Sequence, residues 1–293
     1  MLDFKSVTFE DIETVRGYFD RCASHSSDYT TGIIYMWRDF YDMKYAVCGD
    51  ALVFSLGYDG GKEAFLLPHS ENFEEAVREI ENHCRETGKP MHFYSVEKEM
   101  IEKTKKIYPR CRYYAEDMWA DYLYEADMIK NLTGKKYSTQ RNHINKFNRL
   151  YPGYTFGEIT AEDIDTCALL AEKRAESKDS EQASEETKAV LDVLKNLDKY
   201  GFLTGILKVD GAVAGFSCGE ITGDMLTVHI EKANTSFDGV YPVLTHLFLE
   251  KYADEKVKYV NREDDSGDEG LRKSKLSYHP CAMVEKFFVE IDL

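Results

Sequence analysis

Three apolar runs joined by two short turns, between residues 204 and 232, constrain the fold of this chain more than any other feature. The turns are Asp210-Gly211 and Gly223-Asp224, which predict hairpin connections between neighbouring antiparallel strands. An amphipathic helical pattern follows over 241–253, and another strand pattern over 258–262. This order predicts a mixed, mostly antiparallel sheet flanked by helices.

The first half of the chain shows a similar but weaker alternation of strand and helix patterns, for example a strand at 91–96 after a helix at 72–85. A length of 293 residues is natural for two domains. We therefore predict an α/β (α+β) protein with domains at 1–127 and 128–293, the second opening with a basic helix. The polar, acidic residues 179–187 predict a loop.

Composition narrows the possible functions. Seven scattered cysteines without a CxxC pair, and eight dispersed histidines without an HExxH motif, predict reduced thiols and no metal site. No apolar run is long enough to span a membrane, and the first residues lack a signal-peptide pattern, so we expect a cytoplasmic protein. A net charge of -16 argues against DNA as a partner.

One segment departs from this acidic character, because residues 128–157 contain no Asp or Glu. The segment carries six Lys or Arg residues, and its helical pattern places Arg141, Asn145 and Arg149 along one stripe. Ile144 and Phe147 fall on other faces, where they would anchor the helix to the core. The stripe predicts contacts with an anionic ligand; a basic, solvated helix face or a joint between domains is the alternative.

The strand MLTVHIEK, residues 225–232, alternates apolar and polar residues. Alternation places Thr227, His229 and Glu231 on one face. On a central strand this face would line a cleft, with Glu231 as general base for an attacking amine. On a strand with one face in water, the same residues would be ordinary surface side chains.

Polar residues also cluster where the last predicted strand of this sheet ends. We select Asn261, Arg262, Glu263 and Asp265 as site residues, because ligands of α/β proteins bind at such strand ends; an acidic surface turn is the alternative. The next helix carries Arg272 and Lys275 on one face. They form a second basic island, unless they only compensate the helix dipole.

The connection 233–244, ANTSFDGVYPVL, lies where an acyl-CoA enzyme would carry a glycine-rich phosphate loop. It has a single glycine, Gly239, so a coenzyme A cradle is degenerate here. Backbone amides from Phe237 to Gly239 remain candidates for stabilising an oxyanion.

Three segments together resemble a known family. GKKYSTQRNHINKFNRLYP, VHIEKANTSFDGVY and YVNREDDSGDEGLRKSKLSYHP are similar to an uncharacterised bacterial family grouped with the C-terminal domain of phosphatidylglycerol lysyltransferases. RNHINKFNR is also similar to a helix of Fem-type aminoacyltransferases. The order of elements resembles the GNAT acyltransferase superfamily. The resemblance implies two tandem, duplicated GNAT-like domains.

The resemblance also implies a function and a site. We expect an acyl- or aminoacyl-transferase that moves an activated acyl group from aminoacyl-tRNA or acyl-CoA to an amine or hydroxyl, without a tightly bound cofactor. The implied site residues are catalytic His229, Glu231 and Glu263, and donor- or acceptor-binding Arg141, Asn142, Asn145, Arg149, Phe237, Gly239, Asn261, Arg262, Asp265, Arg272 and Lys275.

Two points stay open at this stage. A tRNA-dependent enzyme of this net charge needs both basic islands on one continuous surface. If the two islands lie on separate surfaces, a small anionic donor is preferred. The alternative to an enzyme is a non-catalytic GNAT-like protein that binds an anionic metabolite or a protein partner, which the degenerate loop at Gly239 favours.

Overall fold

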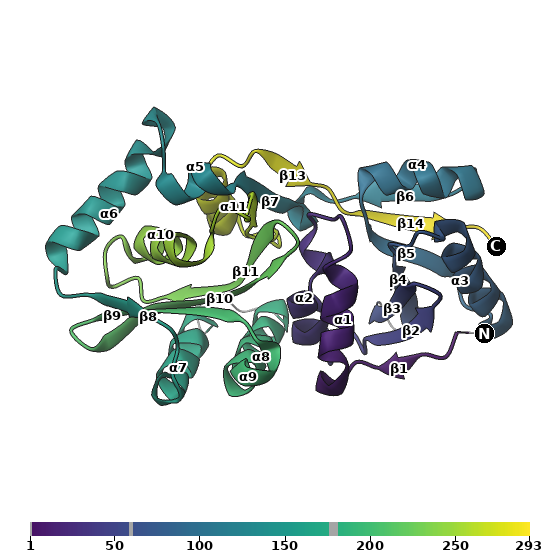
Figure 1. The fold of residues 1–293 in the computed structure, drawn as a ribbon, viewed down its shortest axis with the longest axis horizontal. Coiled ribbons are helices and arrows are strands. Elements are labelled where there is room, and N and C mark those ends of the chain that lie inside the picture. Colours follow the sequence, from purple (N-terminus) through teal and green to yellow (C-terminus); the bar gives the residue numbers. More distant parts are fainter. Residues whose placement is uncertain (1, 59–60, 176–180) are drawn as a thin grey trace. The chain divides into compact units, whose positions relative to one another are not determined.

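The computed structural model describes residues 2–58, 61–175 and 181–293. It divides the chain into two compact units, the first made of 1–121, 264–269 and 283–293, and the second of 122–263 and 270–282. In its described residues each unit is built around a mixed, mostly antiparallel sheet of seven strands (Figure 1). The division differs from a single cut between 127 and 128, because the chain returns to the first unit twice.

The first sheet has the order β1-β2-β3-β4-β5-β14-β6. The elements of this unit are β1 (Lys5–Ser6), α1 (Ile12–Phe19), α2 (Thr31–Trp37), β2 (Lys44–Cys48), β3 (Ala51–Tyr58), β4 (Lys62–Leu66), α3 (Phe73–Thr87), β5 (Met91–Val96), α4 (Lys98–Ile107), β6 (Arg112–Ala115) and β14 (Phe287–Ile291). The last strand, β14, inserts between β5 and β6 and pairs with both. Buried Val289 and Ile291 then join the core formed with α3 and α4, which explains why the C-terminus belongs to this unit.

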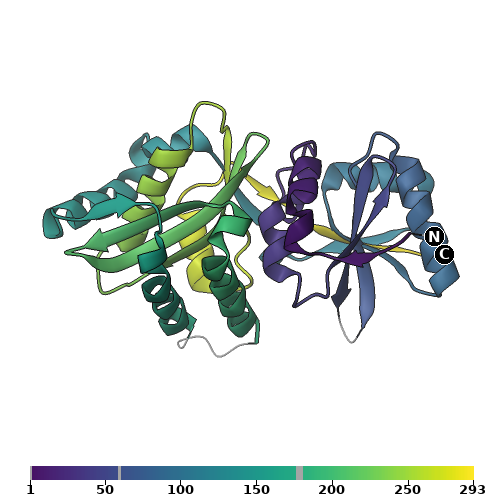
Figure 2. The same ribbon diagram turned by 60° about the horizontal axis from the view of Figure 1, so that its bottom comes forward.

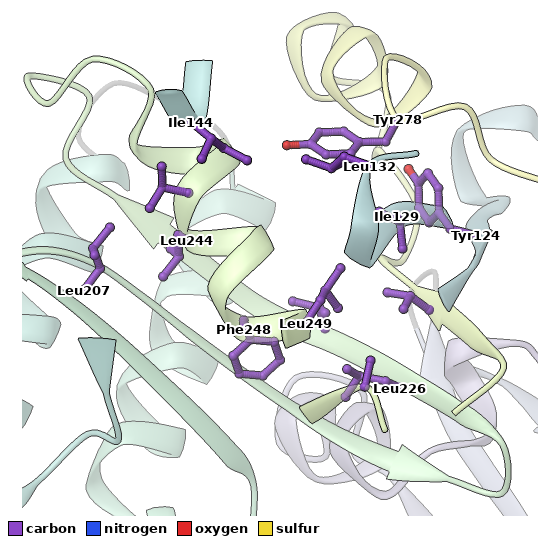
Figure 3. Close-up of a cluster of buried hydrophobic side chains, with 14 of the residues drawn as sticks. Tyr124, Ile129, Leu132, Ile144, Leu207, Leu226, Leu244, Phe248, Leu249 and Tyr278 are labelled. Carbon is purple, nitrogen blue, oxygen red and sulfur yellow. The ribbon is translucent and has the colours of Figure 1, made fainter. Parts of the chain in front are cut away.

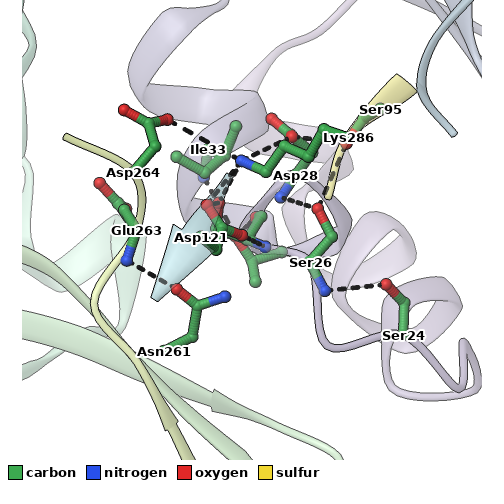
Figure 4. Close-up of polar contacts among 12 residues, drawn as sticks. Ser24, Ser26, Asp28, Ile33, Ser95, Asp121, Asn261, Glu263, Asp264 and Lys286 are labelled. Carbon is green, nitrogen blue, oxygen red and sulfur yellow. Dashed lines mark hydrogen bonds and ion pairs between the residues drawn. The ribbon is translucent and has the colours of Figure 1, made fainter. Parts of the chain in front are cut away.

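A polar cluster lies in the interior of the first unit, around Lys286 (Figure 4). Its ammonium lies 2.7 Å from Asp121, 3.0 Å from Asp28 and 3.9 Å from Asp264. Burial alone would lower the pKa of Lys286, but the three carboxylates raise it well above its usual range. The backbone N–H of Ser27 donates to the second oxygen of the buried Asp121 carboxylate (2.7 Å), so this oxygen also has a hydrogen-bond partner.

The second sheet has the order β13-β7-β12-β11-β10-β9-β8. The elements from β7 to β13 are β7 (Asp121–Glu125), α5 (Ala126–Asn131), α6 (Ser138–Leu150), β8 (Thr155–Gly157), α7 (Ile164–Ala175), α8 (Glu181–Lys195), α9 (Leu197–Tyr200), β9 (Leu203–Val209), β10 (Ala212–Thr222), β11 (Met225–Ala233), α10 (Val240–Tyr252), β12 (Tyr259–Asn261), α11 (Glu269–Leu276) and β13 (Ala282–Val284). The predicted meander is present as β9, β10 and β11.

Helices cover both faces of this sheet (Figure 2). α10 packs on one face with α5 and α6, and α7 and α8 lie on the other. The core beneath α10 contains buried Leu244, Phe248 and Leu249, which pack with Leu207 and Leu226 of the sheet (Figure 3).

Helices α6 and α8 test two predictions made from the sequence. In α6, Ile144 and Phe147 are buried against this core, as predicted. The loop predicted at 179–187 is wrong from residue 181 onward, because α8 begins at Glu181; residues 179 and 180 lie outside the described residues. Ala, Glu and Lys favour a helix strongly enough to outweigh the polar character of this segment.

Candidate functional site

The site lies where two parallel strands of the second sheet separate. β11 and β12 pair only from Met225–Tyr259 to Thr227–Asn261. β12 ends at Asn261, whereas β11 continues to Ala233. Beyond Thr227 the two strands therefore diverge, and side chains fill the space between them. The carboxyl ends of neighbouring parallel strands are the usual ligand position in such folds.

A β-bulge lies at the point of divergence. Cys218 of β10 is opposite Ile230, but the next residue, Gly219, is opposite Val228, so His229 is the extra residue of β11. A Cβ on Gly219 would lie 2.3 Å from the carbonyl oxygen of Thr227. Only glycine therefore allows the two backbones to approach this closely.

The bulge corrects the alternation predicted for β11. Thr227, His229 and Glu231 do not share one face, because the extra residue reverses the phase of the strand. Glu231 lies on the α10 side, where the hydroxyl of Thr245 donates to its carboxylate (2.6 Å). His229 remains on the opposite side of the sheet from α10.

His229 is held between two carboxylates. Its Nδ1 lies 2.7 Å from Glu263 and its Nε2 lies 2.9 Å from Glu220. Phe202 stacks on the imidazole ring at 5.1 Å between centroids. A neutral imidazole has a single N–H, so only the imidazolium donates to both carboxylates.

Charge and burial act in opposite directions on this histidine. Burial alone would lower the pKa of His229, but the hydrogen bonds and charges of Glu220 and Glu263 raise it to about 9. His229 is therefore charged at neutral pH, and the group of three side chains carries one net negative charge. Of the three, Glu263 has the most exposed side chain, at 24%.

The backbone of Glu263 is constrained at several points. Its φ of 58° is in the left-handed region, which is unfavourable for a residue with a side chain. Its N–H donates to the side chain of Asn261 (2.6 Å, Figure 4), and its carbonyl accepts from the N–H of Tyr122 (3.1 Å). Strained residues fixed in this way are concentrated at functional sites.

A second ion pair crosses the diverging strands on the α10 side. Arg262 donates to Glu231 at 2.5 Å, and its guanidinium lies 4.9 Å from the centre of the Tyr278 ring. Both oxygens of Glu231 are thus engaged, one by Arg262 and the other by Thr245.

Several polar atoms around the divergence have no hydrogen-bond partner. In the described part of the chain seven buried side-chain nitrogen or oxygen atoms lack one, and they include Ser217 Oγ, Thr227 Oγ1 and Arg262 Nη1. These three come from β10, β11 and the residue after β12. Ser217 is opposite Glu231 and lies with Arg262 on the α10 side, whereas Thr227 lies on the side of His229. Buried polar groups are almost always paired, so Ser217 Oγ and Arg262 Nη1 are candidates for contact with a ligand on the α10 side.

Three other predicted site residues, Lys275, Arg272 and Asp265, follow the strand end. Lys275 is buried, and its ammonium donates to the carbonyls of Arg262 (2.6 Å) and Glu263 (3.3 Å). It therefore fixes the strand end, which corrects its assignment to an exposed basic island. Arg272 is half-buried. Asp265 belongs to the first unit, where its carboxylate accepts the N–H of Gly267 (2.9 Å).

The predicted stripe on α6 divides into a structural part and an exposed part. Arg141 is half-buried and donates to the carbonyls of Leu132 and Gly134, just beyond the end of α5. Asn142, Asn145 and Arg149 are exposed.

The connection before α10 does not form an open phosphate cradle. Gly239 has a φ of 82°, and a Cβ there would lie 2.7 Å from the carbonyl oxygen of His143 in α6. The N–H of Phe237 donates to the carbonyl of Asn234 (3.1 Å). The single glycine therefore serves the close packing of α6 on α10, and the residues here do not fit a coenzyme A pyrophosphate.

Glu220 contacts His229 in the candidate site, and the sequence interpretation missed it. It is the one charged residue within β10, which is otherwise uncharged. The turn at Gly223-Asp224 places Glu220 opposite Thr227, and hence diagonal to His229 on the same face. Hairpin register could have revealed this contact.

Two features are absent from the described residues. None of the helices in residues 2–58, 61–175 and 181–293 has the length and apolar character needed to cross a membrane. Within the same ranges, no three or more His, Cys, Asp or Glu side chains are grouped so that they could hold a metal ion.

Comparison with solved structures shows the fold. A conserved protein of unknown function from Bacteroides thetaiotaomicron is 30% identical, with a TM-score of 0.94 over 100% of both chains. L-PGS from Bacillus licheniformis is 15% identical, with a TM-score of 0.69 over 95% of this chain and 91% of that one. FemX is 11% identical, with a TM-score of 0.57 over 99% of this chain and 98% of that one. The fold is thus a tandem GNAT-like fold.

Sequence comparison shows the family. An uncharacterized protein of Mycoplasmoides gallisepticum is 25% identical over 174 residues, and the match spans about half of that protein, 56% of its length. The family model described as "Phosphatidylglycerol lysyltransferase, C-terminal" matches residues 19–290. The chain belongs to this phosphatidylglycerol lysyltransferase C-terminal family.

Proposed function

We propose that the second unit catalyses transfer of an activated aminoacyl group to an amine or hydroxyl acceptor, at the divergence of β11 and β12. The observation that carries the proposal is the carboxylate–imidazolium group of Glu263 and His229 at the end of β12, where the adjacent Arg262 has a buried Nη1 without a partner in the described residues. The family and the related fold of FemX support this class of reaction.

Glu263 is the proposed general base. Its side chain is more exposed than those of His229 and Glu220, and its backbone is fixed by Asn261 and Tyr122. The His229 imidazolium orients this carboxylate, and Glu220 shares the positive charge of the ring. Glu263 can then accept the proton of the attacking amine or hydroxyl as the new acyl bond forms, and return it to the ribose oxygen of the tRNA as the ester bond breaks. His229 and Glu220 are positioning residues in this scheme.

Glu231 receives a different role from the one predicted. Because both of its oxygens are engaged, we propose that it holds Arg262 in place rather than accepting a proton. Arg262 Nη1 has no partner among the described residues, so it is the proposed donor to the oxygen that becomes negative during acyl transfer.

An aminoacyl donor is favoured over an acyl-CoA donor. The single glycine of this connection packs closely against His143, and the N–H of Phe237 is already paired with Asn234, so the connection is a poor cradle for the pyrophosphate of an acyl-CoA. The proposed donor is accordingly aminoacyl-tRNA, in line with the family relationship.

A thermal-shift screen tests the proposal. A donor that binds the native state raises the melting temperature by mass action. We expect aminoacyl-tRNA to raise it in the wild type and in Glu263→Gln, and acetyl-CoA to have no effect. Stabilisation by acetyl-CoA alone would contradict the choice of donor, and stabilisation by neither donor would favour a non-catalytic protein.

A further inference from the structure

The last strand of the first sheet, β6, has a free edge. β6 pairs with β14 on one side (Figure 1), and on its other side lies no strand of residues 2–58, 61–175 and 181–293. All four residues of β6 are exposed, including Tyr113 at 44% and Tyr114 at 52%. The free edge of such a strand presents backbone N–H and C=O groups that can pair with another strand.

The usual protections of a sheet edge are missing from β6. Proteins block free edges with a very short strand, a lysine, a proline or a β-bulge. The opposite edge of the same sheet follows this rule, because β1 has two residues and one of them is Lys5. β6 contains neither lysine nor proline, and it pairs with β14 over four residues without a break in register. Of the two edges, β6 is therefore the one suited to pairing with another chain.

The charges of this segment are complementary to themselves in an antiparallel arrangement. Arg112, Tyr114 and Glu116 share one face, because residues two apart in a strand do so. Glu116 continues the extended conformation of β6, with φ of -118° and ψ of 129°. If a two-fold axis perpendicular to the sheet places Tyr114 opposite Tyr114 of a second copy, Arg112 lies opposite Glu116 of that copy. The axis makes this pair of opposite charges occur twice.

The same register also fits the two tyrosines of β6. On the other face, Tyr113 would lie opposite Ala115 of the second copy, so that a large side chain meets a small one. Lys105 already donates to the hydroxyl of Tyr113 (3.2 Å) and holds this ring beside α4. The Tyr114 ring, 5.5 Å from the ring of Phe288, would meet the Tyr114 ring of the second copy. Aromatic pairs in opposite positions stabilise antiparallel strands.

We propose that β6 pairs with β6 of a second copy of this chain, in an antiparallel register centred on Tyr114, and forms a symmetric homodimer. The fit in charge, size and aromatic character within one short segment selects a second copy over an unrelated strand. The segment 112–116 is short, and it buries less than the roughly 1,200 Å² of a stable interface. The net charge of -16 also opposes association. We therefore expect a weak dimer that forms at high protein concentration.

Mixing two charge-reversal variants tests the pairing, with sedimentation equilibrium as the measurement. Glu116→Arg or Arg112→Glu alone places like charges opposite each other, and each should dimerise at least about tenfold more weakly than the wild type. An equimolar mixture of the two should regain association, because each arginine then faces a glutamate. The control Glu86→Arg, at an exposed position of α3, should stay within about twofold of the wild type. A mixture no stronger than its components, or a wild type that is monomeric up to about 1 mM, would overturn the proposal.

Disulfide trapping tests the register. Tyr114→Cys places a thiol opposite its own copy, where the Cα atoms of antiparallel strands lie about 4.5–5.5 Å apart, within reach of a disulfide. In the matched control Tyr113→Cys, the two thiols lie two residues out of register, too far apart to be bridged. We expect mild oxidation to link Tyr114→Cys into a dimer at least about fivefold more than the control or the wild type, which accounts for the exposed native Cys281. Equal linkage in Tyr113→Cys, or none in Tyr114→Cys, would assign any association to another surface and overturn the proposal.

Discussion

The charged state of His229 makes the stability of the second unit depend on pH. Its pKa rises from an ordinary value of 6.5 to about 9 on folding. At about 1.4 kcal/mol per pKa unit, this difference corresponds to roughly 3 kcal/mol. Because the folded value is the higher one, the stabilisation is complete below about pH 6.5 and is lost as the pH rises through 9.

The perturbation that isolates this contribution is His229→Gln. We expect the variant to be less stable at neutral pH, because Glu220 and Glu263 then face an uncharged amide. The fall in stability that the imidazolium of His229 causes between pH 6.5 and 9.5 should be absent from the variant. His143→Gln, at an exposed position on α6, is the control and should keep the slope of the wild type.

Urea unfolding followed by two signals provides the assay. Both tryptophans, Trp37 and Trp119, belong to the first unit, so their fluorescence reports its unfolding, while far-ultraviolet circular dichroism reports both units. A transition that appears in circular dichroism but not in tryptophan fluorescence is therefore that of the second unit. The reasoning about the imidazolium is refuted if the free energy of unfolding of the second unit is the same at pH 6.5 and 9.5 in the wild type. It is also refuted if this free energy falls by the same amount in His229→Gln as in the wild type.

Two further predictions concern packing. Gly219→Ala should destabilise the second unit by about 3 kcal/mol or more in urea unfolding, because its Cβ would lie 2.3 Å from a backbone oxygen. The control Gly157→Ala should cost little, because nothing lies within 4 Å of its Cβ. Equal effects of the two substitutions would contradict the account of the bulge. Lys286→Met should lower the stability of the first unit by roughly 3–5 kcal/mol, because it leaves the buried Asp121 carboxylate uncompensated. The control Lys98→Met, at a side chain that is 79% exposed, should change the unfolding detected by tryptophan fluorescence little. An equally small effect of Lys286→Met would show that the polar cluster around Lys286 does not stabilise the fold.

The sequence predicted the fold class because its signals are local. Turns at Asp210-Gly211 and Gly223-Asp224 determine the hairpins of the second sheet, and the spacing of Ile144 and Phe147 determines the buried face of α6. The assignment of β14 to the first sheet was beyond this approach, since a short apolar strand carries no information about its partner.

The contacts within the candidate site could be predicted in part for a related reason. His229 and Glu263 do lie together, because polar residues near the ends of two strands converge in this fold. Arg262 lies on the α10 side instead, with Glu231. The side on which Glu231 lies depends on the bulge at His229, and a single glycine at 219 does not reveal a bulge from sequence alone. The burial of Lys275 likewise depends on tertiary contacts with the strand end.

The most direct test of the account is a single-turnover deacylation assay. Labelled aminoacyl-tRNA is incubated with the full chain and a mixture of small amine and hydroxyl acceptors, and the loss of label from tRNA is measured over time. We predict that the wild type discharges at least one aminoacyl-tRNA, and that Glu263→Gln does so at least about tenfold more slowly while binding tRNA normally. Equal rates in the two proteins, or no discharge of any aminoacyl-tRNA above the rate in buffer, would contradict the central claim.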